Sequence, residues 1–368
     1  RMFSNCASRH VVDEEGQTCD FFRTQALLGN DKPYAFRNGS KVQSTSTEKL
    51  CFVYGGQGSQ WKEMGKALLD TQPTFKATIE RLNEYLQKHM TEENIPQSER
   101  VDLMQLFEDG QRWLQREVTA VGIASYQVAM TNILAEMGIR PDFYCGHSLG
   151  EVAAGYGAAG WEDGSCMQTE EETIKIAYER SRLSGKIVPG RKLLRLRHNT
   201  FKLLNKDSLV NGVTFLVNDG EFGFWYLPEE EHAAERILTD ARACASDIEE
   251  VAVFDLTGRM VAVGLEVDAL VQAISHLKLR ETTVACHNSP TGQTLSGSAV
   301  EIEQLKRFLE GTVEKLFWRE LDTDNIAYHA PHLACYKEYL ATQFAKVLGE
   351  HRSKPRQLDV KWLSTSRG

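Results

Sequence analysis

The chain has 368 residues, with 42 lysines and arginines against 51 aspartates and glutamates, so its formal net charge is −9. An acidic chain lacks the cationic surface that nucleic-acid phosphates require, so we expect no nucleic-acid partner. No uninterrupted apolar run approaches the roughly 20 residues that cross a bilayer, and residues 1–9 lack the apolar core of a secretory signal. We therefore expect no membrane partner, and about two domains from the length.

The eight cysteines are scattered along the chain and form no Cys-x-x-Cys pair, so we predict no metal site and no thioredoxin-type motif. Cys51 and Cys145 stand in apolar runs, where we interpret the thiol as a small hydrophobic group. A reducing, cytoplasmic location is the simplest interpretation. Because residue 1 is an arginine, we expect the sequence to begin inside a longer polypeptide.

The first half of the chain alternates predicted strands and helices. Residues 1–48 are polar and broken, which is typical of a linker or of the tail of a preceding domain. Apolar runs at 50–54 and 142–145 predict strands, and helices are expected from about residue 61, over 75–89 and over 119–136. In the last of these helices we expect one apolar face, made by Ile123, Tyr126, Met130, Ile133 and Leu134. This alternation predicts a parallel sheet covered by helices on both faces.

A second alternation follows later in the chain. We predict strands over 260–263, 282–286 and 293–296, and helices over 267–277 and 300–309. This β-α-β-β-α order is typical of a small ferredoxin-like domain. A helix over 333–348 and a strand over 360–363 are expected after it.

The run Gly146-His147-Ser148-Leu149-Gly150 fits the pattern G-x-S-x-G, between a predicted strand and an alanine-rich helix over 151–159. A strand-to-helix turn this tight strains the serine and exposes its Oγ above the sheet. The turn also directs backbone N–H groups of the helix start at an acyl oxygen. We therefore predict that Ser148 is a nucleophile. The alternative is a structural glycine turn that happens to contain a serine.

Several motifs resemble one family. Extended to Glu151, the serine motif resembles the nucleophile motif of the acyltransferases of fatty acid and polyketide synthases. Residues 55–61 (Gly-Gly-Gln-Gly-Ser-Gln-Trp) are similar to the loop that opens that domain, and residues 286–290 and 362–366 resemble further stretches of animal fatty acid synthase. The chain is identified as a member of the malonyl/acetyl transferase domains of animal-type fatty acid synthase or a related polyketide synthase. The resemblance implies an α/β-hydrolase-like large subdomain with a parallel sheet, and a small ferredoxin-like α+β subdomain.

The resemblance also implies a reaction and its partners. Ser148 takes a malonyl or acetyl group from coenzyme A and passes it to the phosphopantetheine of an acyl carrier protein. No tightly bound cofactor is implied, because coenzyme A and phosphopantetheine carry the acyl group. An acyl carrier protein and the neighbouring ketosynthase domain of a synthase are the implied partners.

The resemblance assigns roles to further residues. His329 corresponds to the catalytic histidine, which activates a serine by taking its proton. The backbone N–H groups of Gln57 and Leu149 correspond to the oxyanion hole. Arg180 corresponds to the arginine that binds the malonyl carboxylate with its planar fork. Tyr328 stands in the specificity loop where phenylalanine is common.

Ala330 follows in that loop where serine is common, so methylmalonyl becomes a candidate acyl group. We expect Arg182, on another side of the Arg180 helix, to be solvated. A dinucleotide phosphate loop at residues 55–58 is an alternative that lacks the G-x-G-x-x-G spacing. Two other functions stay open, namely a serine hydrolase or thioesterase and an inactive fragment or scaffold of a synthase.

The predicted organisation has five parts. A linker or tail at 1–48 precedes the first part of the large subdomain at 49–190. An atypical insertion at 191–258 comes next, either a genuine lid or partner-binding excursion or a gene-model artefact. The small subdomain spans 259–325, and the return to the large subdomain spans 326–368. We also expect a short insertion at 160–169. Compared with the family, the end is truncated, and the missing segment orients the catalytic histidine, so we expect the chain alone to be poorly active.

Overall fold

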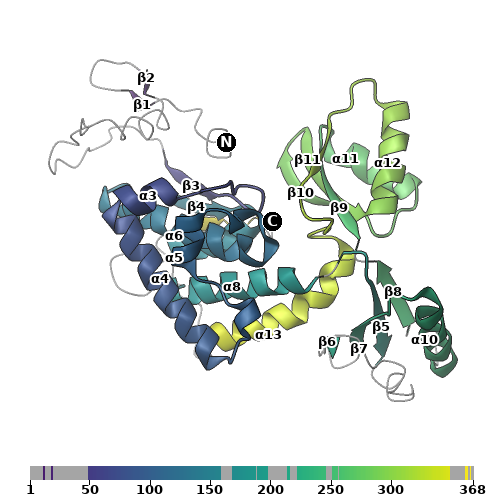
Figure 1. Cartoon of the computed structure of the whole chain (residues 1–368). Helices are drawn as coiled ribbons and strands as arrows, with labels where there is room; N and C mark the ends of the chain where they lie inside the picture. The colour runs from purple at the N-terminus through teal and green to yellow at the C-terminus, as the bar shows by residue number, and fades with distance from the viewer. Residues whose placement is uncertain are drawn as a thin grey trace. The chain divides into compact units, whose positions relative to one another are not determined.

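The computed structural model describes residues 11–12, 18–19, 49–158, 168–187, 189–197, 214–215, 222–245, 251–255, 257–348, 361–363 and 365. The chain divides into two compact units, Arg1–Tyr178 with Ser353–Gly368, and Glu179–Arg352 (Figure 1). Apart from the paired strands β1 (Val11–Val12) and β2 (Thr18–Cys19), the predicted linker at 1–48 lies outside the described residues. So does most of the short insertion predicted at 160–169.

A parallel sheet forms the centre of the first unit. Its strands are β3 (Cys51–Tyr54), β4 (Phe143–Gly146) and β13 (Lys361–Leu363), in the order β13-β4-β3. Within the described residues both neighbouring pairs are parallel, and Tyr144 lies between Phe52 and Trp362. The strands predicted at 50–54, 142–145 and 360–363 are therefore confirmed. Because all of these strands run the same way, their carboxyl ends meet at one edge, where α/β proteins place their ligands.

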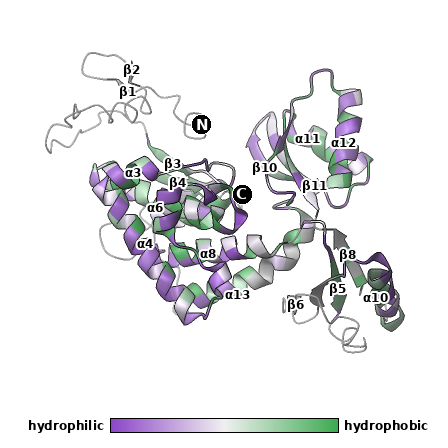
Figure 2. Cartoon of the chain, viewed as in Figure 1, coloured by the Kyte–Doolittle hydropathy of each residue, from purple (hydrophilic) through white to green (hydrophobic). Residues whose placement is uncertain are grey.

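Helices pack around this sheet. They are α3 (Lys66–Thr71), α4 (Pro73–Glu92), α5 (Leu103–Asp109), α6 (Arg116–Glu136) and α7 (Glu151–Gly157). Short 3₁₀ turns lie at Gln97–Glu99, Arg112–Leu114 and Ser148–Gly150. Helix α4 mixes hydrophilic and hydrophobic residues (Figure 2) and buries its apolar side chains, among them Phe75, Ile79, Leu82 and Leu86. The helix expected from about residue 61 begins at Lys66.

Helix α6 differs from its prediction. It packs against both α4 and α7, so it is buried on nearly every side. The single apolar face that we expected was wrong, because Tyr126, Met130 and Leu134 of that face are half-buried while Ser125 and Thr131 elsewhere on the helix are buried. By length and composition α6 is apolar enough to span a membrane, but 78 % of its apolar window is buried. A helix that is apolar all round is typical of a protein core.

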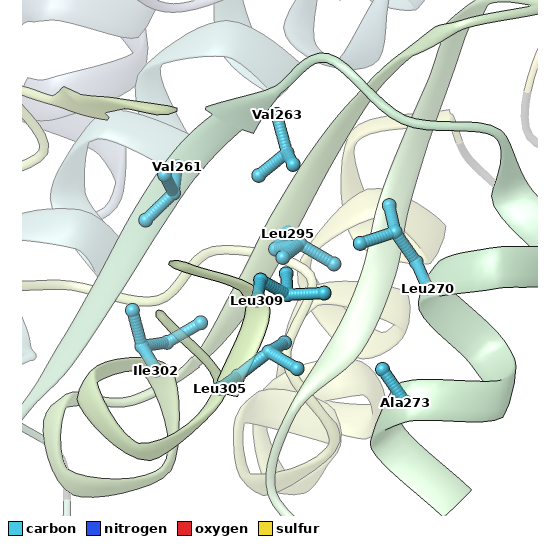
Figure 3. Close-up of a cluster of buried hydrophobic side chains, with 8 residues drawn as sticks. All are labelled: Val261, Val263, Leu270, Ala273, Leu295, Ile302, Leu305 and Leu309. Carbon is cyan, nitrogen blue, oxygen red and sulfur yellow. The ribbon is translucent and has the colours of Figure 1, made fainter. Parts of the chain in front are cut away.

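The ferredoxin-like part of the second unit is as predicted, with one strand more. It contains β9 (Gly258–Val263), α11 (Val267–His276), β10 (Thr283–Ser289), β11 (Gly292–Ser298), α12 (Ala299–Thr312) and β12 (Trp318–Leu321). The antiparallel sheet has the order β10-β11-β9-β12. Figure 3 shows its core, in which Leu270 and Ala273 of α11 and Ile302, Leu305 and Leu309 of α12 pack against Val261, Val263 and Leu295 of the sheet.

Residues 191–258, predicted as an insertion, contain a second antiparallel sheet. Strands β5 (Lys192–Arg197), β6 (Thr214–Phe215), β7 (Phe222–Tyr226) and β8 (Val251–Asp255) have the order β6-β7-β5-β8, with α10 (Glu231–Cys244) beside them. Leu194 and Leu196 of β5 form a buried cluster with Leu227 and with Ile237 and Ala241 of α10. The described part of this segment therefore has a hydrophobic core, while the boundaries that we drew around it stay a prediction.

Strand β5 is buried on both faces. Leu193, between Lys192 and Leu194, belongs to a different cluster. Its other members are Leu183 of α8 (Glu170–Lys186), Ile187 directly after that helix, Ile326 and Tyr336. The helix predicted over 333–348 is a 3₁₀ segment, Pro331–Tyr336, followed by α13 (Lys337–Leu348). The first strand of the insertion thus shares one core with the segment that contains His329.

Candidate functional site

Ser148 lies in the 3₁₀ turn between β4 and α7, at the carboxyl edge of the parallel sheet. Its backbone φ is +54°, in the left-handed region that residues with a Cβ avoid. Such a conformation costs on the order of 1–3 kcal/mol and persists only where the surrounding structure holds it. The turn therefore has the strained geometry that the G-x-S-x-G pattern predicts.

The two glycines of this motif permit close backbone contacts. A Cβ on Gly146 would lie 2.2 Å from the backbone nitrogen of Glu151, and one on Gly150 would lie 2.2 Å from the carbonyl oxygen of Tyr54. That same oxygen accepts a hydrogen bond from the backbone N–H of His147 at 2.8 Å. Any side chain at either glycine would push the turn away from the strands that hold it.

The predicted oxyanion loop packs directly against this turn. A Cβ on Gly56 would lie 2.5 Å from the carbonyl oxygen of His147 and 3.2 Å from the Cβ of Ser148. The carbonyl oxygen of Gly55 accepts a hydrogen bond from Gln127 Nε2 at 2.7 Å, which fixes the start of the loop. The half-buried Gln57 thus follows a residue in contact with the nucleophile turn, as an oxyanion donor would require.

A buried polar pair lies beneath the turn. The hydroxyl groups of Tyr54 and Thr131 are 2.9 Å apart, and burial raises the pKa of Tyr54 above its usual range. The buried Tyr54 hydroxyl therefore has a hydrogen-bond partner in Thr131. The nearby cysteines behave differently from our expectation. Cys51 is exposed and its Sγ lies 3.8 Å from that of the half-buried Cys145, so neither cysteine is a buried core residue.

Arg180 lies on α8, in the second unit. Desolvation by burial lowers the pKa of its guanidinium, and the electrostatic effect of the nearby Tyr328 opposes this shift. Among the described residues no carboxylate forms an ion pair with Arg180. A cation removed from water in this way is stabilised by an anionic ligand.

Arg182 is not solvated as we expected. Its guanidinium forms an ion pair with the carboxylate of Glu179 at 3.3 Å, and the two side chains are only 18 % and 2 % exposed. The reason is helical spacing, because residues three apart share a face and this face of α8 is buried. Arg182 therefore neutralises a buried carboxylate, while Arg180 on the neighbouring face is left without a carboxylate in the described part of the chain.

His329 lies in a tight turn that follows the ferredoxin-like part. The backbone N–H of Ala330 donates to the carbonyl oxygen of Ala327 at 3.1 Å, and His329 has φ +67° within that turn. Ala327 and Ala330 are buried, while the His329 side chain is exposed. The loop is held from below by Gly258, where a Cβ would lie 2.3 Å from the Cβ of Ala327. The buried residues around it therefore hold His329 in a strained backbone conformation with its side chain exposed.

Tyr328 precedes the histidine in this turn. Its ring packs against the buried cluster of Leu183, Ile187, Leu193, Ile326 and Tyr336. Its hydroxyl is buried and has no hydrogen-bond partner among the described residues. A buried hydroxyl without a partner is unfavourable, and a polar ligand that bonded to it would remove this cost.

The candidate residues thus form two groups. Ser148, Leu149 and Gln57 lie together in the first unit, and Arg180, Tyr328 and His329 lie in the second. Within the second unit, Arg180 and Tyr328 are close enough to interact electrostatically. The individual roles that we assigned to these residues stay predictions.

The sequence reasoning missed the residues that brace the nucleophile turn. Trp362 and Thr365 each form a hydrogen bond with the carboxylate of Glu151 at the start of α7. The sequence analysis used the motifs that contain these residues only as evidence of the family resemblance and predicted no contact between them. The sequence did contain one signal, the glutamate directly after G-x-S-x-G. A carboxylate in the first turn of a helix is favourable by itself. Its presence there therefore did not indicate a partner elsewhere in the chain.

Comparison with known proteins agrees with this geometry. Residues 51–215, which run from β3 through the nucleophile turn and α8, match the acyl transferase domain family. This segment of the chain is similar to acyl transferase domains. Among curated proteins it is 26 % identical over 319 residues to the highly reducing polyketide synthase pspA of Penicillium soppii, and 27 % identical over 313 residues to highly reducing polyketide synthase 40 of Fusarium mangiferae. These alignments cover 87 % and 85 % of the chain, which spans only about a tenth of each relative.

Solved acyl transferase structures share the fold. The acyltransferase domain of the polyketide synthase PpsC of Mycobacterium tuberculosis superposes with a TM-score of 0.56 at 19 % identity, over 86 % of this chain and 68 % of that one. MCAT from Streptococcus pneumoniae gives a TM-score of 0.53 at 17 % identity, over 85 % and 73 % of the two chains. The α/β acyl transferase fold and the resemblance to synthase acyltransferases are therefore confirmed.

Proposed function

We propose that this acyl transferase domain moves a malonyl or acetyl group from coenzyme A to the phosphopantetheine of an acyl carrier protein, through an acyl-serine at Ser148. The observation that carries the proposal is the left-handed turn of Ser148 at the carboxyl edge of the parallel sheet, packed against the glycine-rich loop at 55–58. Both the strain and the close packing serve to expose one hydroxyl beside backbone donors.

In the first half-reaction, Ser148 Oγ attacks the thioester carbonyl carbon while His329 takes the hydroxyl proton. The N–H groups of Leu149 and Gln57 stabilise the oxyanion of the tetrahedral intermediate. Collapse of this intermediate breaks the carbon–sulfur bond, and the thiolate of coenzyme A leaves with the proton from His329. In the second half, the phosphopantetheine thiol attacks the acyl-serine by the same steps, and Ser148 recovers its proton.

The acyl group is proposed to be malonyl because of Arg180. Its guanidinium is desolvated enough to lower its pKa and forms no ion pair with a carboxylate of the described residues. The malonyl carboxylate would supply the missing negative charge in a bidentate contact. Acetyl lacks that carboxylate and would gain nothing from Arg180. The buried Tyr328 hydroxyl nearby is a second donor for the same carboxylate.

The setting of the reaction is proposed from the relatives. They are multidomain polyketide synthases of which this chain matches about a tenth, so an acyl carrier protein and a ketosynthase domain are the proposed partners. The acyl group would serve polyketide biosynthesis, or fatty acid biosynthesis by analogy. We propose a cytoplasmic location and no resident cofactor, since coenzyme A and phosphopantetheine enter only as thioester carriers.

The function is tested by incubating the full chain with radiolabelled malonyl-CoA, with and without an acyl carrier protein in its phosphopantetheine form. We expect one malonyl group on the intact protein by mass spectrometry, its absence in Ser148→Ala, and label on the carrier. Free malonate with no loaded carrier would instead establish a thioesterase. No adduct on the wild-type chain would reject catalysis and leave a scaffold or an inactive fragment.

Arg180→Ala tests the acyl preference. We expect malonyl transfer to fall by about 100-fold or more, corresponding to the loss of a charge-assisted bidentate contact of about 3 kcal/mol, while acetyl transfer is kept. Arg259→Ala is the matched control, because Arg259 lies in the same unit and forms only an exposed ion pair with Glu320 at 3.2 Å. An equal loss of both acyl groups in Arg180→Ala would reject the carboxylate contact.

A further inference from the structure

A network of hydrogen bonds connects the helix after the nucleophile with strand β13. The carboxylate of Glu151, the first residue of α7, accepts a hydrogen bond through Oε2 from the indole Nε1 of Trp362 at 2.9 Å. Its Oε1 accepts from the backbone N–H of Thr365 and lies 3.0 Å from the Thr365 hydroxyl. That hydroxyl donates its one proton to the carbonyl oxygen of Gly146, which is the closer of the two neighbouring oxygens.

These contacts hold both ends of the nucleophile turn. Gly146 is the last residue of β4, and Glu151 is the first of α7, so the two residues enclose the four-residue segment that contains Ser148. Thr365 contacts the residue before this segment and the residue after it. One side chain therefore fixes the separation between the two ends of a turn whose serine is in a strained conformation.

The network is anchored by apolar packing as well. Trp362 packs against the buried cluster of Tyr54, Tyr144, Ala153, Ala154 and Ala158, which joins the sheet to α7. Its ring therefore lies over α7 with the indole N–H directed at the first turn of that helix. A glutamate suits this position, since its carboxylate is favourable at the helix start and its side chain is long enough to reach β13.

We propose that Glu151, Trp362 and Thr365 form a clasp that positions Ser148, so that these three are positioning residues for acyl transfer. The expected effect on the acylation rate rests on the proposed function. The expected effect on the conformation of the turn rests on the hydrogen bonds alone. Without the clasp, the turn would relax away from the left-handed conformation of Ser148. Ser148 would then still bear a hydroxyl, but less often in the geometry that reacts.

The decisive variants act on Thr365. Thr365→Val removes the hydroxyl but keeps the shape and the backbone N–H, whereas Thr365→Ser keeps the hydroxyl. Thr71→Val is the matched control, because the Thr71 hydroxyl also donates to a backbone carbonyl, that of Ala67 at 2.6 Å, but on an exposed helix away from the motif. Trp362→Phe removes the indole N–H and keeps most of the ring.

The first readout is the rate at which malonyl-CoA acylates Ser148 in the full chain. We expect Thr365→Val to lower the rate at saturating malonyl-CoA by about 10-fold to 100-fold, the range of a misplaced reacting group. The KM should stay within about two-fold, because the clasp touches no part of the substrate. Thr365→Ser should restore the rate, and Thr71→Val should leave it unchanged. A wild-type rate in Thr365→Val, or no rescue by serine, would overturn the proposal.

The second readout requires no catalysis. Hydrogen exchange of the peptides that cover residues 143–157 should be faster in Thr365→Val and Trp362→Phe than in the wild type and Thr71→Val, while peptides from 258–312 should be unchanged. Equal exchange at 143–157 in all four proteins would overturn the clasp, whatever the activity. If the wild type is not acylated but the exchange difference appears, the proposed function fails and the clasp stands.

Discussion

Gly150→Ala is the sharpest test of how the nucleophile turn is built. Gly150 has φ −59° and ψ −18°, a right-handed conformation that alanine adopts without strain. The requirement for glycine is therefore one of space alone. The added Cβ would lie 2.2 Å from the carbonyl oxygen and 2.7 Å from the carbonyl carbon of Tyr54, both well below the 3.4 Å at which ordinary contact begins.

The cost follows from what has to move. The Tyr54 carbonyl is backbone and accepts the His147 N–H at 2.8 Å, so relief of the clash weakens that bond. Overpacking costs about 1–3 kcal/mol, and the weakened hydrogen bond adds about 1 kcal/mol. We expect a local destabilisation of about 2–4 kcal/mol, which corresponds to hydrogen exchange about 30-fold to 1,000-fold faster over residues 143–157.

Hydrogen exchange with mass spectrometry measures this change in each unit separately. Gly311→Ala in α12 is the control, because a Cβ there meets nothing within 4 Å. It should stabilise the helix by up to about 1 kcal/mol and slow exchange over residues 299–312. If Gly150→Ala exchanged at the wild-type rate over residues 143–157, the packing argument for the motif glycines would be refuted.

Further substitutions test the second unit. Leu194→Ala should destabilise the sheet at 191–258 by about 2–5 kcal/mol, since Leu194 is fully buried; Val300→Ala, 77 % exposed, should change stability by less than about 0.5 kcal/mol. Equal denaturation midpoints for the two variants would contradict a packed core there. Glu179→Gln should lower the free energy of unfolding by up to about 3–5 kcal/mol, because it leaves Arg182 without its buried carboxylate; a midpoint shift no larger than that of an exposed charge would show that the pair is solvated. Tyr328→Phe should leave stability unchanged or raise it by about 1 kcal/mol, because it removes a buried hydroxyl without a partner in the described part of the chain. A large fall in the melting temperature would reveal a hydrogen bond to that hydroxyl.

The elements that the sequence predicted well are those whose signal is local. The strands that end at Tyr54 and Gly146 are short apolar runs closed by glycine, and the strained serine follows from the spacing of its own motif. Strand β12 was missed because it is an edge strand with exposed residues at three of its four positions, so no apolar alternation marks it. In α6 the helical period was correct, but a helix enclosed by neighbours has no single buried face.

The remaining site residues could be reached only through the resemblance. Arg180 and His329 are ordinary residues by composition, and their environments depend on burial and turn geometry that only the folded chain provides. The misjudged Arg182 illustrates the same limit. Whether an arginine on a charged helix meets water or a buried carboxylate depends on which face of that helix is covered. No pattern within α8 itself conveys this.

The position of β13 in the chain determines when the nucleophile turn can be braced during synthesis. Trp362 and its partner Glu151 are 211 residues apart in the chain, and the whole second unit is synthesised between them. The nucleophile turn therefore leaves the ribosome long before the strand that braces it. Contacts of such separation form late and slowly. We expect the sheet edge at β4 to stay open until β13 has been made, and Ser148 to acquire its reactive geometry only when β13 docks.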